Sequence, residues 1–206
     1  MRSVCLMGYS GHSYVVCDTV ISMGVDLKHY CDISPKVNNP YNLDHLGTEQ
    51  VALQQGFFEN LIPVLAIGDN ELRMRIGNFL SNAGIKLFTA IHAKSYIASK
   101  VSIGEGSVVF AGVVINPLVE IGQGVICSTN CIIDHESSIG EYSHICPGAV
   151  LTGNVKIGKR VFIGANAVVK QGLTIGDGAI IGAGSVVVKN VDANTIVYGI
   201  PSNIKS

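Results

Sequence analysis

The 206-residue sequence lacks an excess of charge of either sign. Its 14 Lys and Arg residues nearly balance its 15 Asp and Glu residues, and the basic residues are scattered along the chain. Proteins that bind nucleic acid gather basic residues into a patch, because that positive field provides much of their affinity. We therefore expect no nucleic-acid partner.

Long apolar runs are also missing. No stretch reaches the roughly 18 apolar residues that a membrane-spanning helix requires. The apolar start of the chain is broken at Gly8-Tyr9-Ser10-Gly11, which makes it too short for the core of a signal peptide. We expect a soluble, cytoplasmic protein without a membrane span.

The sequence has no strong metal or disulfide motif. The spacing Cys127-x3-Cys131 has no histidine at the distance that a zinc finger uses. Both residues fall on positions expected to face a packed core, while Cys5 and Cys17 fall on a predicted strand and helix. We expect the six cysteines to be reduced thiols that act as small apolar residues, and we predict no metal site.

A six-residue repeat fills the chain between residues 91 and 187. Every sixth position is Ile, Val or Leu, with Cys127 as the one exception. A period of six fits neither a helix nor an isolated strand and is typical of a hexapeptide-repeat β-helix. The repeated positions are Ile91, Ile97, Ile103, Val109, Ile115, Ile121, Cys127, Ile133, Ile139, Ile145, Leu151, Ile157, Ile163, Val169, Ile175, Ile181 and Val187.

Each hexad is expected to supply one short strand and one turn, so that three hexads form a triangular coil. Residues three hexads apart then lie directly above one another, and backbone groups pair between coils. The repeated position and the small or apolar residue four positions later face the interior. Glycine often follows the repeated residue, as at Gly104 and Gly140, and we expect these glycines to adopt positive φ at the corners.

The first third of the chain alternates apolar strands with helical patterns. Three strands are predicted at residues 2–8, 26–33 and 61–67. A helix follows Gly11, and another begins near Gly68-Asp69-Asn70. The second helix is expected to carry on its surface Glu71, Leu72, Arg73, Ile76 and Leu80. This order predicts a small parallel α/β sheet with ligands at the carboxyl ends of its strands.

The segment between residues 35 and 58 is harder to interpret. Residues 38–42 read as a loop, and a short helix or strand begins near residue 53.

Two loops at predicted strand ends are candidate ligand contacts. Gly8-Tyr9-Ser10-Gly11-His12 lacks the full G-x-G-x-x-G pattern, so its glycines either serve only the turn or form a backbone nest for phosphate. Asp32 either accepts hydrogen bonds from a sugar or base or is an ordinary turn residue. Gly68-Asp69-Asn70 repeats the turn at a second strand end, which favours one cleft shared by both loops.

His135 and Glu136 stand together at outward positions of one hexad. A carboxylate beside an imidazole stabilises the imidazolium, and a rigid corner holds both groups in place, so the pair is a candidate general base. A surface His beside a Glu also occurs without any function. Gly153 lies one coil further on, where its amide could donate to an oxyanion, and His144 offers a donor near the same seam or is a packed surface residue.

Several of these motifs together resemble one protein family. The hexads, Asp134-His135-Glu136, the run from Gly153 to Gly158 and Gly199-Ile200-Pro201 look like bacterial sugar acetyltransferases of the left-handed β-helix class. With the two N-terminal loops, the chain is similar to the subfamily of UDP-4-amino-sugar N-acetyltransferases and sialic-acid O-acetyltransferases. It departs from that group at Ile33, where members can carry a second acidic residue.

The break in the pattern near residue 90 favours two domains. The resemblance implies an N-terminal Rossmann-like domain (1–88) that binds a nucleotide-linked amino sugar. It also implies a left-handed β-helix with a C-terminal cap (89–206) that binds acetyl-CoA along the seams of a homotrimer. By this resemblance His135 is the general base and Glu136 its supporting carboxylate. The implied acetyl-CoA contacts are His144, Gly153, Ala165 and Ala183. The implied nucleotide-sugar contacts are Ser10, Gly11, His12, Asp32, Gly68 and Asn70.

The leading hypothesis is direct acetyl transfer from acetyl-CoA to the amine of a nucleotide-linked 4-amino sugar, for surface glycan biosynthesis. Cys146 is a weak candidate for an acyl-enzyme nucleophile. O-acetylation of sialic acid uses the same base and remains an alternative. A β-helical zinc carbonic anhydrase is disfavoured, because His92, His135 and His144 lack the close paired spacing of its ligands. A trimeric scaffold without catalysis is the alternative of another class.

Overall fold

The computed structural model describes residues 3–204, so the outermost residues of both predicted domains, and Arg2 of the first predicted strand, lie outside the described part. The chain begins with a four-stranded parallel sheet in the order β3-β2-β1-β4. Its strands are β1 (Ser3–Met7), β2 (Leu27–Cys31), β3 (Asp44–His45) and β4 (Leu61–Leu65). Its helices are α1 (Gly11–Ser22), α2 (Glu49–Gln54), the 3-10 turn η1 (Phe57–Glu59) and α3 (Asn70–Asn82).

The predicted strands and helices of this unit are confirmed. The segment that was hard to interpret from the sequence contains β3, α2 and η1, and residues 38–42 form no helix or strand. One expectation for α3 is wrong, because Arg73 and Leu80 have no exposed surface.

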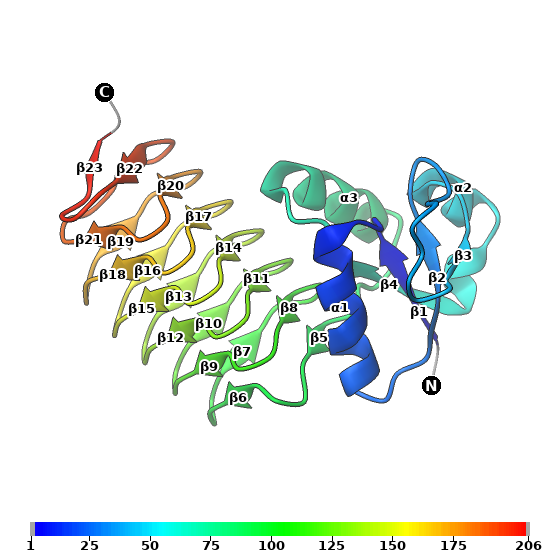
Figure 1. The fold of residues 1–206 in the computed structure, drawn as a ribbon, viewed down its shortest axis with the longest axis horizontal. Helices are drawn as coiled ribbons and strands as arrows, with labels where there is room; N and C mark the ends of the chain where they lie inside the picture. The colour runs from blue at the N-terminus through cyan, green and yellow to red at the C-terminus, as the bar shows by residue number, and fades with distance from the viewer. Residues whose placement is uncertain (1–2, 205–206) are drawn as a thin grey trace.

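The rest of the chain is a parallel β-helix (Figure 1), in which the coils stack in one column away from the N-terminal unit. Seventeen two-residue strands form it. They are β5 (Ala90–Ile91), β6 (Tyr96–Ile97), β7 (Ser102–Ile103), β8 (Val108–Val109), β9 (Val114–Ile115), β10 (Glu120–Ile121), β11 (Ile126–Cys127), β12 (Ile132–Ile133), β13 (Ser138–Ile139), β14 (His144–Ile145), β15 (Val150–Leu151), β16 (Lys156–Ile157), β17 (Phe162–Ile163), β18 (Val168–Val169), β19 (Thr174–Ile175), β20 (Ile180–Ile181) and β21 (Val186–Val187). The last coil is closed by β22 (Ile196–Tyr198) and β23 (Asn203–Ile204).

These strands form the three faces of a triangular prism. Sheet I contains β5, β8, β11, β14, β17, β20, β22 and β23; sheet II contains β6, β9, β12, β15, β18 and β21; sheet III contains β7, β10, β13, β16 and β19. The chain passes from sheet I to II to III and back, which defines a I–II, a II–III and a III–I corner. Ile121 pairs with Ile139 and Ile133 with Leu151, so residues 18 apart are stacked as predicted.

The repeated aliphatic residues form the core of the column. Val109, Ile133 and Ile163 are among those that are completely buried. Buried serines at the fifth position also bridge neighbouring coils: the Ser143 hydroxyl donates to the Gly158 carbonyl (2.7 Å) and accepts from the Val161 amide (2.9 Å). The hexad therefore specifies both the apolar filling and the spacing of the coils.

The expectation of positive φ for the glycines that follow the repeated residue is wrong. Positive φ occurs two residues later, at the fourth position of every hexad from Lys100 to Gly184, where non-glycine residues such as Glu136 and Tyr142 also adopt it. Glycine follows the repeated residue because the coils approach closely there. A Cβ on Gly140 would overlap the backbone of Gly158.

The N-terminal unit packs on sheet I and the III–I corner. Val108, Phe110 and Ile126 of sheet I share a buried cluster with residues of β1 and α1. The covered part of the sheet ends at Phe162, which is 37% exposed. The contact fixes which face of the prism the strand-end loops adjoin.

Candidate functional site

His135 and Glu136 lie on the II–III corner, between β12 and β13. Nδ1 of His135 is 2.9 Å from Oε2 of Glu136, and the ring is about half exposed. A carboxylate only accepts hydrogen bonds, so in the neutral ring Nδ1 carries the proton and Nε2 keeps its lone pair. Glu136 adopts φ of 60°, and the fourth position of every hexad from Lys100 to Gly184 likewise has positive φ, so this conformation belongs to the corner and not to the pair.

The flanking residues fix the position of the imidazole. The Asp134 carboxylate accepts hydrogen bonds from Asn116 Nδ2 (2.7 Å) and the His135 amide (2.8 Å), and these bonds lower the pKa of Asp134. Gly153 lies one coil above, where a Cβ would come within 2.6 Å of both Cε1 and Nε2 of the ring. Glycine at this position therefore leaves the space that the imidazole occupies.

His144 lies on a different face from His135. It belongs to β14 of sheet I, is nine-tenths buried, and its Nε2 is 2.9 Å from the Ser128 hydroxyl. Within one chain, His144 and His135 therefore do not lie at the same corner. The ring centroid of His144 is instead 6.0 Å from that of His12 in α1 and 5.3 Å from that of Phe162.

His12 and His144 lie side by side at the junction of the two units, His144 buried and His12 partly buried. Burial and then Arg73 lower the pKa of His12 to about 4, and burial, Arg73 and His12 lower the pKa of His144 to about 3, against a hydrogen bond with the Gly68 backbone that raises it. Within residues 3–204, no group hydrogen-bonds to Nε2 of His12. A buried polar atom without a partner costs about 1–3 kcal/mol, so this nitrogen is a candidate to bind a polar group of a ligand.

A small cavity of about 170 Å³ lies at the carboxyl ends of β1, β2 and β4. Parallel α/β sheets bind ligands at this edge. It is lined by Gly8, Cys31, Asp32, Ile33, Glu49, Ile67, Leu72, Arg75 and Ile76. The side chain of Ile33, one of these residues, is 89% exposed.

Asp32 holds the first strand-end loop in place. Its carboxylate accepts from the amides of Tyr9 (3.0 Å) and Ile33 (2.7 Å), and Lys36 Nζ lies 2.9 Å away. Burial alone would raise the pKa of Asp32, but hydrogen bonds from Lys36 and the two amides lower it. The first loop continues into the exposed Ser10 and Gly11 at the start of α1.

The second strand-end loop meets the first. A Cβ on Gly68 would lie 3.7 Å from Cγ of His12, so the two loops adjoin as predicted. The amide side chain of Asn70, in contrast, is fully used within the chain. Its Nδ2 donates to the carbonyls of Arg160 (3.1 Å) and Val161 (3.2 Å), and its Oδ1 accepts from Arg73 (2.7 Å). Asn70 thus fastens the loop to the β-helix.

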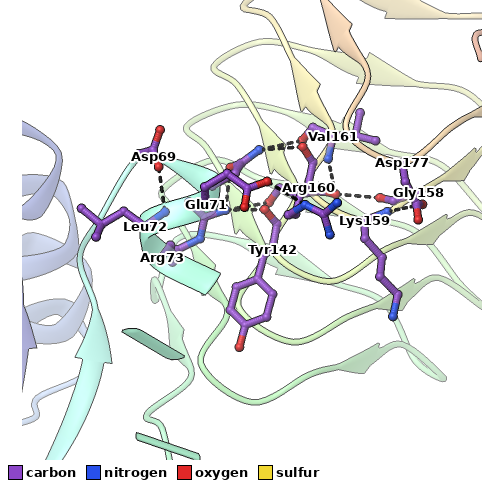
Figure 2. Close-up of polar contacts among 12 residues, drawn as sticks. Asp69, Glu71, Leu72, Arg73, Tyr142, Gly158, Lys159, Arg160, Val161 and Asp177 are labelled. Carbon is purple, nitrogen blue, oxygen red and sulfur yellow. Dashed lines mark hydrogen bonds and ion pairs between the residues drawn. The ribbon is translucent and has the colours of Figure 1, made fainter. Parts of the chain in front are cut away.

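Arg73 is the residue of this region that sequence reasoning missed. Its guanidinium reaches from α3 to the β-helix, where Nη2 donates to the Tyr142 carbonyl at 2.7 Å (Figure 2). Beside it, Arg160 Nε forms an ion pair with Glu71 at 2.7 Å. These contacts join the second loop to the III–I corner.

The remaining candidates, Ala165 and Ala183, lie on the I–II corner, 18 residues apart and therefore stacked. One chain thus separates the candidates into a II–III group (His135, Glu136 and Gly153), a I–II group, and a group around sheet I and the N-terminal loops. In a triangular prism the II–III corner lies opposite sheet I. A single chain does not bring His135 to the strand-end loops.

Within residues 3–204, no group of three or more His, Cys, Asp or Glu residues is placed to hold a metal ion. No described helix combines the length and apolar character needed to cross a membrane.

Family models match both parts of the chain. The PglD N-terminal domain matches residues 3–80, the hexapeptide repeat of succinyl-transferase matches residues 93–117, and the bacterial transferase hexapeptide matches residues 154–189.

Solved structures match over the full length of the chain. A mutant of perosamine N-acetyltransferase from Caulobacter crescentus, in complex with CoA and GDP-perosamine, is 33% identical with a TM-score of 0.95, covering 100% of this chain and 98% of that one. The acetyltransferase domain of PglB from Neisseria gonorrhoeae, in complex with acetyl coenzyme A, is 30% identical with a TM-score of 0.94 and 99% coverage of both chains. The chain belongs to the left-handed β-helix, hexapeptide-repeat sugar acetyltransferases that carry a PglD-type N-terminal domain.

Proposed function

We propose that the protein transfers the acetyl group of acetyl-CoA to the amine of a nucleotide-linked 4-amino sugar, with His135 as general base. The observation that carries the proposal is the His135–Glu136 contact of 2.9 Å on a rigid corner, in a chain similar over its whole length to an enzyme solved with CoA and GDP-perosamine. We assign sugar-nucleotide binding to residues 1–88 and acetyl transfer to residues 89–206. The unpaired thiols fit a reducing cytoplasm.

The reaction proceeds by direct attack. The amine nitrogen of the sugar bonds to the thioester carbon, the carbon–sulfur bond breaks, and CoA leaves as a thiolate that takes up a proton. Nε2 of His135 accepts the proton lost by the amine, and Glu136 stabilises the imidazolium through Nδ1. A correctly placed general base contributes about 10²–10⁴-fold to the rate, and holding both substrates in one site contributes further.

Cys146 does not serve as a nucleophile in this mechanism. Its side chain is buried, and burial raises the pKa of the thiol to about 12. The thiolate is the reactive form of cysteine, and at neutral pH this residue remains a thiol.

We propose that the active unit is a homotrimer. The outward side chains of sheet II form an apolar column, whereas those of sheet III are polar or charged. The sheet II column is Tyr96, Val114, Ile132, Val150, Val168 and Val186. The sheet III column is Ser102, Glu120, Ser138, Lys156 and Thr174. Burial of the apolar column about a threefold axis removes it from water.

This arrangement assembles the separated candidates. With sheet II facing the axis, the II–III corner of one protomer lies beside the I–II corner of the next. The pair His135 and Gly153 then shares a seam with Ala165 and Ala183 of the neighbouring protomer, where small side chains leave room for acetyl-CoA. The same seam lies near sheet I, which carries His144 and adjoins the loops of Gly68 and Ser10.

The test is a thiol-release assay with acetyl-CoA and a panel of UDP-, dTDP- and GDP-4-amino sugars, together with free and CMP-linked sialic acid. We expect turnover of one amino-sugar class that falls at least about 10²-fold in His135→Ala, in a protein that sediments as a trimer. Turnover of sialic acid alone would indicate O-acetylation. No turnover with any acceptor, or full activity of His135→Ala, would overturn the proposal.

A further inference from the structure

Two residues of opposite charge line the cavity at the carboxyl ends of β1, β2 and β4. Glu49 is the first residue of α2, and Arg75 lies in the second turn of α3. Both border the same volume of about 170 Å³, and neither belongs to a strand-end loop. The cavity therefore has an anionic side and a cationic side.

Neither charge is neutralised within the chain. Arg75 is exposed, and among residues 3–204 neither it nor Glu49 forms an ion pair. Oε1 of Glu49 accepts from Nε2 of the adjacent Gln50 at 2.9 Å. Two opposite charges that border one small cavity without pairing leave room between them for a group that binds both.

The rest of the cavity offers few other polar side chains to a ligand. Oδ2 of Asp32 accepts from the Tyr9 amide, and Oδ1 accepts from the Ile33 amide and lies beside Lys36. The other lining residues are glycine, cysteine or aliphatic: Gly8, Cys31, Ile33, Ile67, Leu72 and Ile76. Ligand pockets commonly combine apolar walls with a few polar groups that fix the orientation of the ligand. In this cavity those groups are Glu49 and Arg75.

The cavity is continuous with the first strand-end loop. Gly8 lines the cavity and begins that loop, which leads to the exposed Ser10 and Gly11 at the start of α1. Parallel α/β sheets bind nucleotides at this edge, with phosphate favoured near the start of a helix. A nucleotide whose phosphates lie at Ser10 and Gly11 can therefore place its base in the cavity.

The hydrogen-bonding edge of guanine matches this pair of charges. Guanine alone among the common bases places two N–H donors side by side, at N1 and at its 2-amino group, and a carboxylate can accept from both. Its O6 and N7 are acceptors that a guanidinium binds in a bidentate manner. Uracil and thymine present one N–H between two carbonyl oxygens, which a carboxylate repels. Adenine and cytosine place an acceptor nitrogen beside their amino group.

We infer that the cavity is a guanine site, in which Glu49 accepts from N1 and the 2-amino group and Arg75 donates to O6 and N7. The exposed apolar side chain of Ile33 packs against the face of the base. The acceptor substrate is then a GDP-linked amino sugar. The inference rests on the proposed function for the sugar, whereas the choice of base rests on the cavity.

The test is calorimetric titration of the full chain with GDP, IDP, UDP and dTDP, without acetyl-CoA. IDP differs from GDP only in lacking the 2-amino group, so it loses one contact with Glu49 and keeps both contacts with Arg75. We expect IDP to bind about tenfold more weakly than GDP, the cost of one hydrogen bond to a charged group. UDP and dTDP should bind at least about 10²-fold more weakly than GDP, because neither side of the cavity is matched.

Two variants separate the two contacts. Glu49→Ala should bring GDP and IDP to nearly equal affinity, since the residue that distinguishes them is gone. Arg75→Ala should weaken GDP and IDP by the same factor, about tenfold or more, because both bases carry O6 and N7. The matched control is Glu59→Ala, which removes an exposed carboxylate that does not border the cavity and should leave all four affinities within about twofold.

Three results would overturn the inference: equal affinity of the native protein for GDP and UDP, no binding of any of the four nucleotides, or a preference for GDP over IDP that survives Glu49→Ala. The titration requires no turnover, so it is independent of the acetyl transfer. A preference for GDP in a protein that acetylates no sugar would refute the proposed function and support the guanine site. Turnover of UDP- or dTDP-linked sugars alone would support acetyl transfer and overturn the guanine site.

Discussion

Replacement of Gly153 by alanine tests whether the placement of the His135 ring controls the rate. The added Cβ would lie 2.6 Å from Cε1 and Nε2, and ordinary contact begins at 3.4 Å, so the ring must retreat by the difference of 0.8 Å. The backbone of Gly153 does not have positive φ, and alanine is compatible with it. The ring is 47% exposed and moves toward solvent, away from its 2.9 Å contact with Glu136.

A displacement of about 1 Å costs on the order of 10²-fold in rate, or about 2.7 kcal/mol of transition-state stabilisation. We therefore expect kcat/KM of Gly153→Ala to fall about 10²-fold in the thiol-release assay. The melting temperature should change little, because the ring moves into water and no core contact is lost.

The matched control is a double-mutant cycle with His135→Ala. Once the imidazole is gone the methyl group has nothing to displace, so the second substitution should add almost no further loss. A methyl group that instead blocks acetyl-CoA would reduce kcat/KM equally in both backgrounds. Native activity of Gly153→Ala, or an equal loss in both backgrounds, would refute the reasoning.

Three further changes test other parts of the site. Glu136→Gln keeps a hydrogen-bond acceptor but removes the charge that stabilises the imidazolium, and steady-state kinetics should show kcat about tenfold lower with KM unchanged; an unchanged kcat would exclude that role. The hydrogen bonds that lower the pKa of Asp32 stabilise the fold above pH about 4, and this stabilisation is lost as pH falls through the folded pKa. Denaturant unfolding of Asp32→Asn should therefore show a loss of about 1–2 kcal/mol in the free energy of unfolding at pH 7 and a progressively smaller loss below pH 4. An equal loss at all pH values would contradict this. Cys146→Ser should retain kcat within about twofold, and mass spectrometry of the native enzyme with acetyl-CoA should find no acetylated protein; an adduct on this residue would reinstate the acyl-enzyme route.

The β-helix could be predicted from the sequence because every hexad must bury an apolar residue at the same position. Inward positions such as Ile133 and Ile163 must be apolar in each coil, so the period is visible without any knowledge of the rest of the fold. The backbone conformation of each glycine is harder to predict, because glycine is favoured at two positions of the repeat for two different reasons. Close approach of coils requires it at Gly140, and positive φ favours it at Gly148.

Arg73 could not be found in the same way. Most of its partners are backbone carbonyls, which leave no mark in the sequence, and charged residues are rarely buried without a counter-ion. The separation of His144 from His135, in contrast, can be predicted from the number of residues between them. The two residues are nine positions apart, half of the 18-residue coil, which places them on different parts of the prism.

The stacked coils divide the β-helix into equal steps along its axis. Neighbouring coils are separated by about 4.8 Å, the spacing of paired strands. Gly153 lies one coil from His135, and Ala183 lies one coil from Ala165. Removing or adding one coil of 18 residues beyond Gly153 would shorten or lengthen the seam by that single step while every remaining residue kept its face. In the proposed trimer, the length of the seam therefore changes in whole coils.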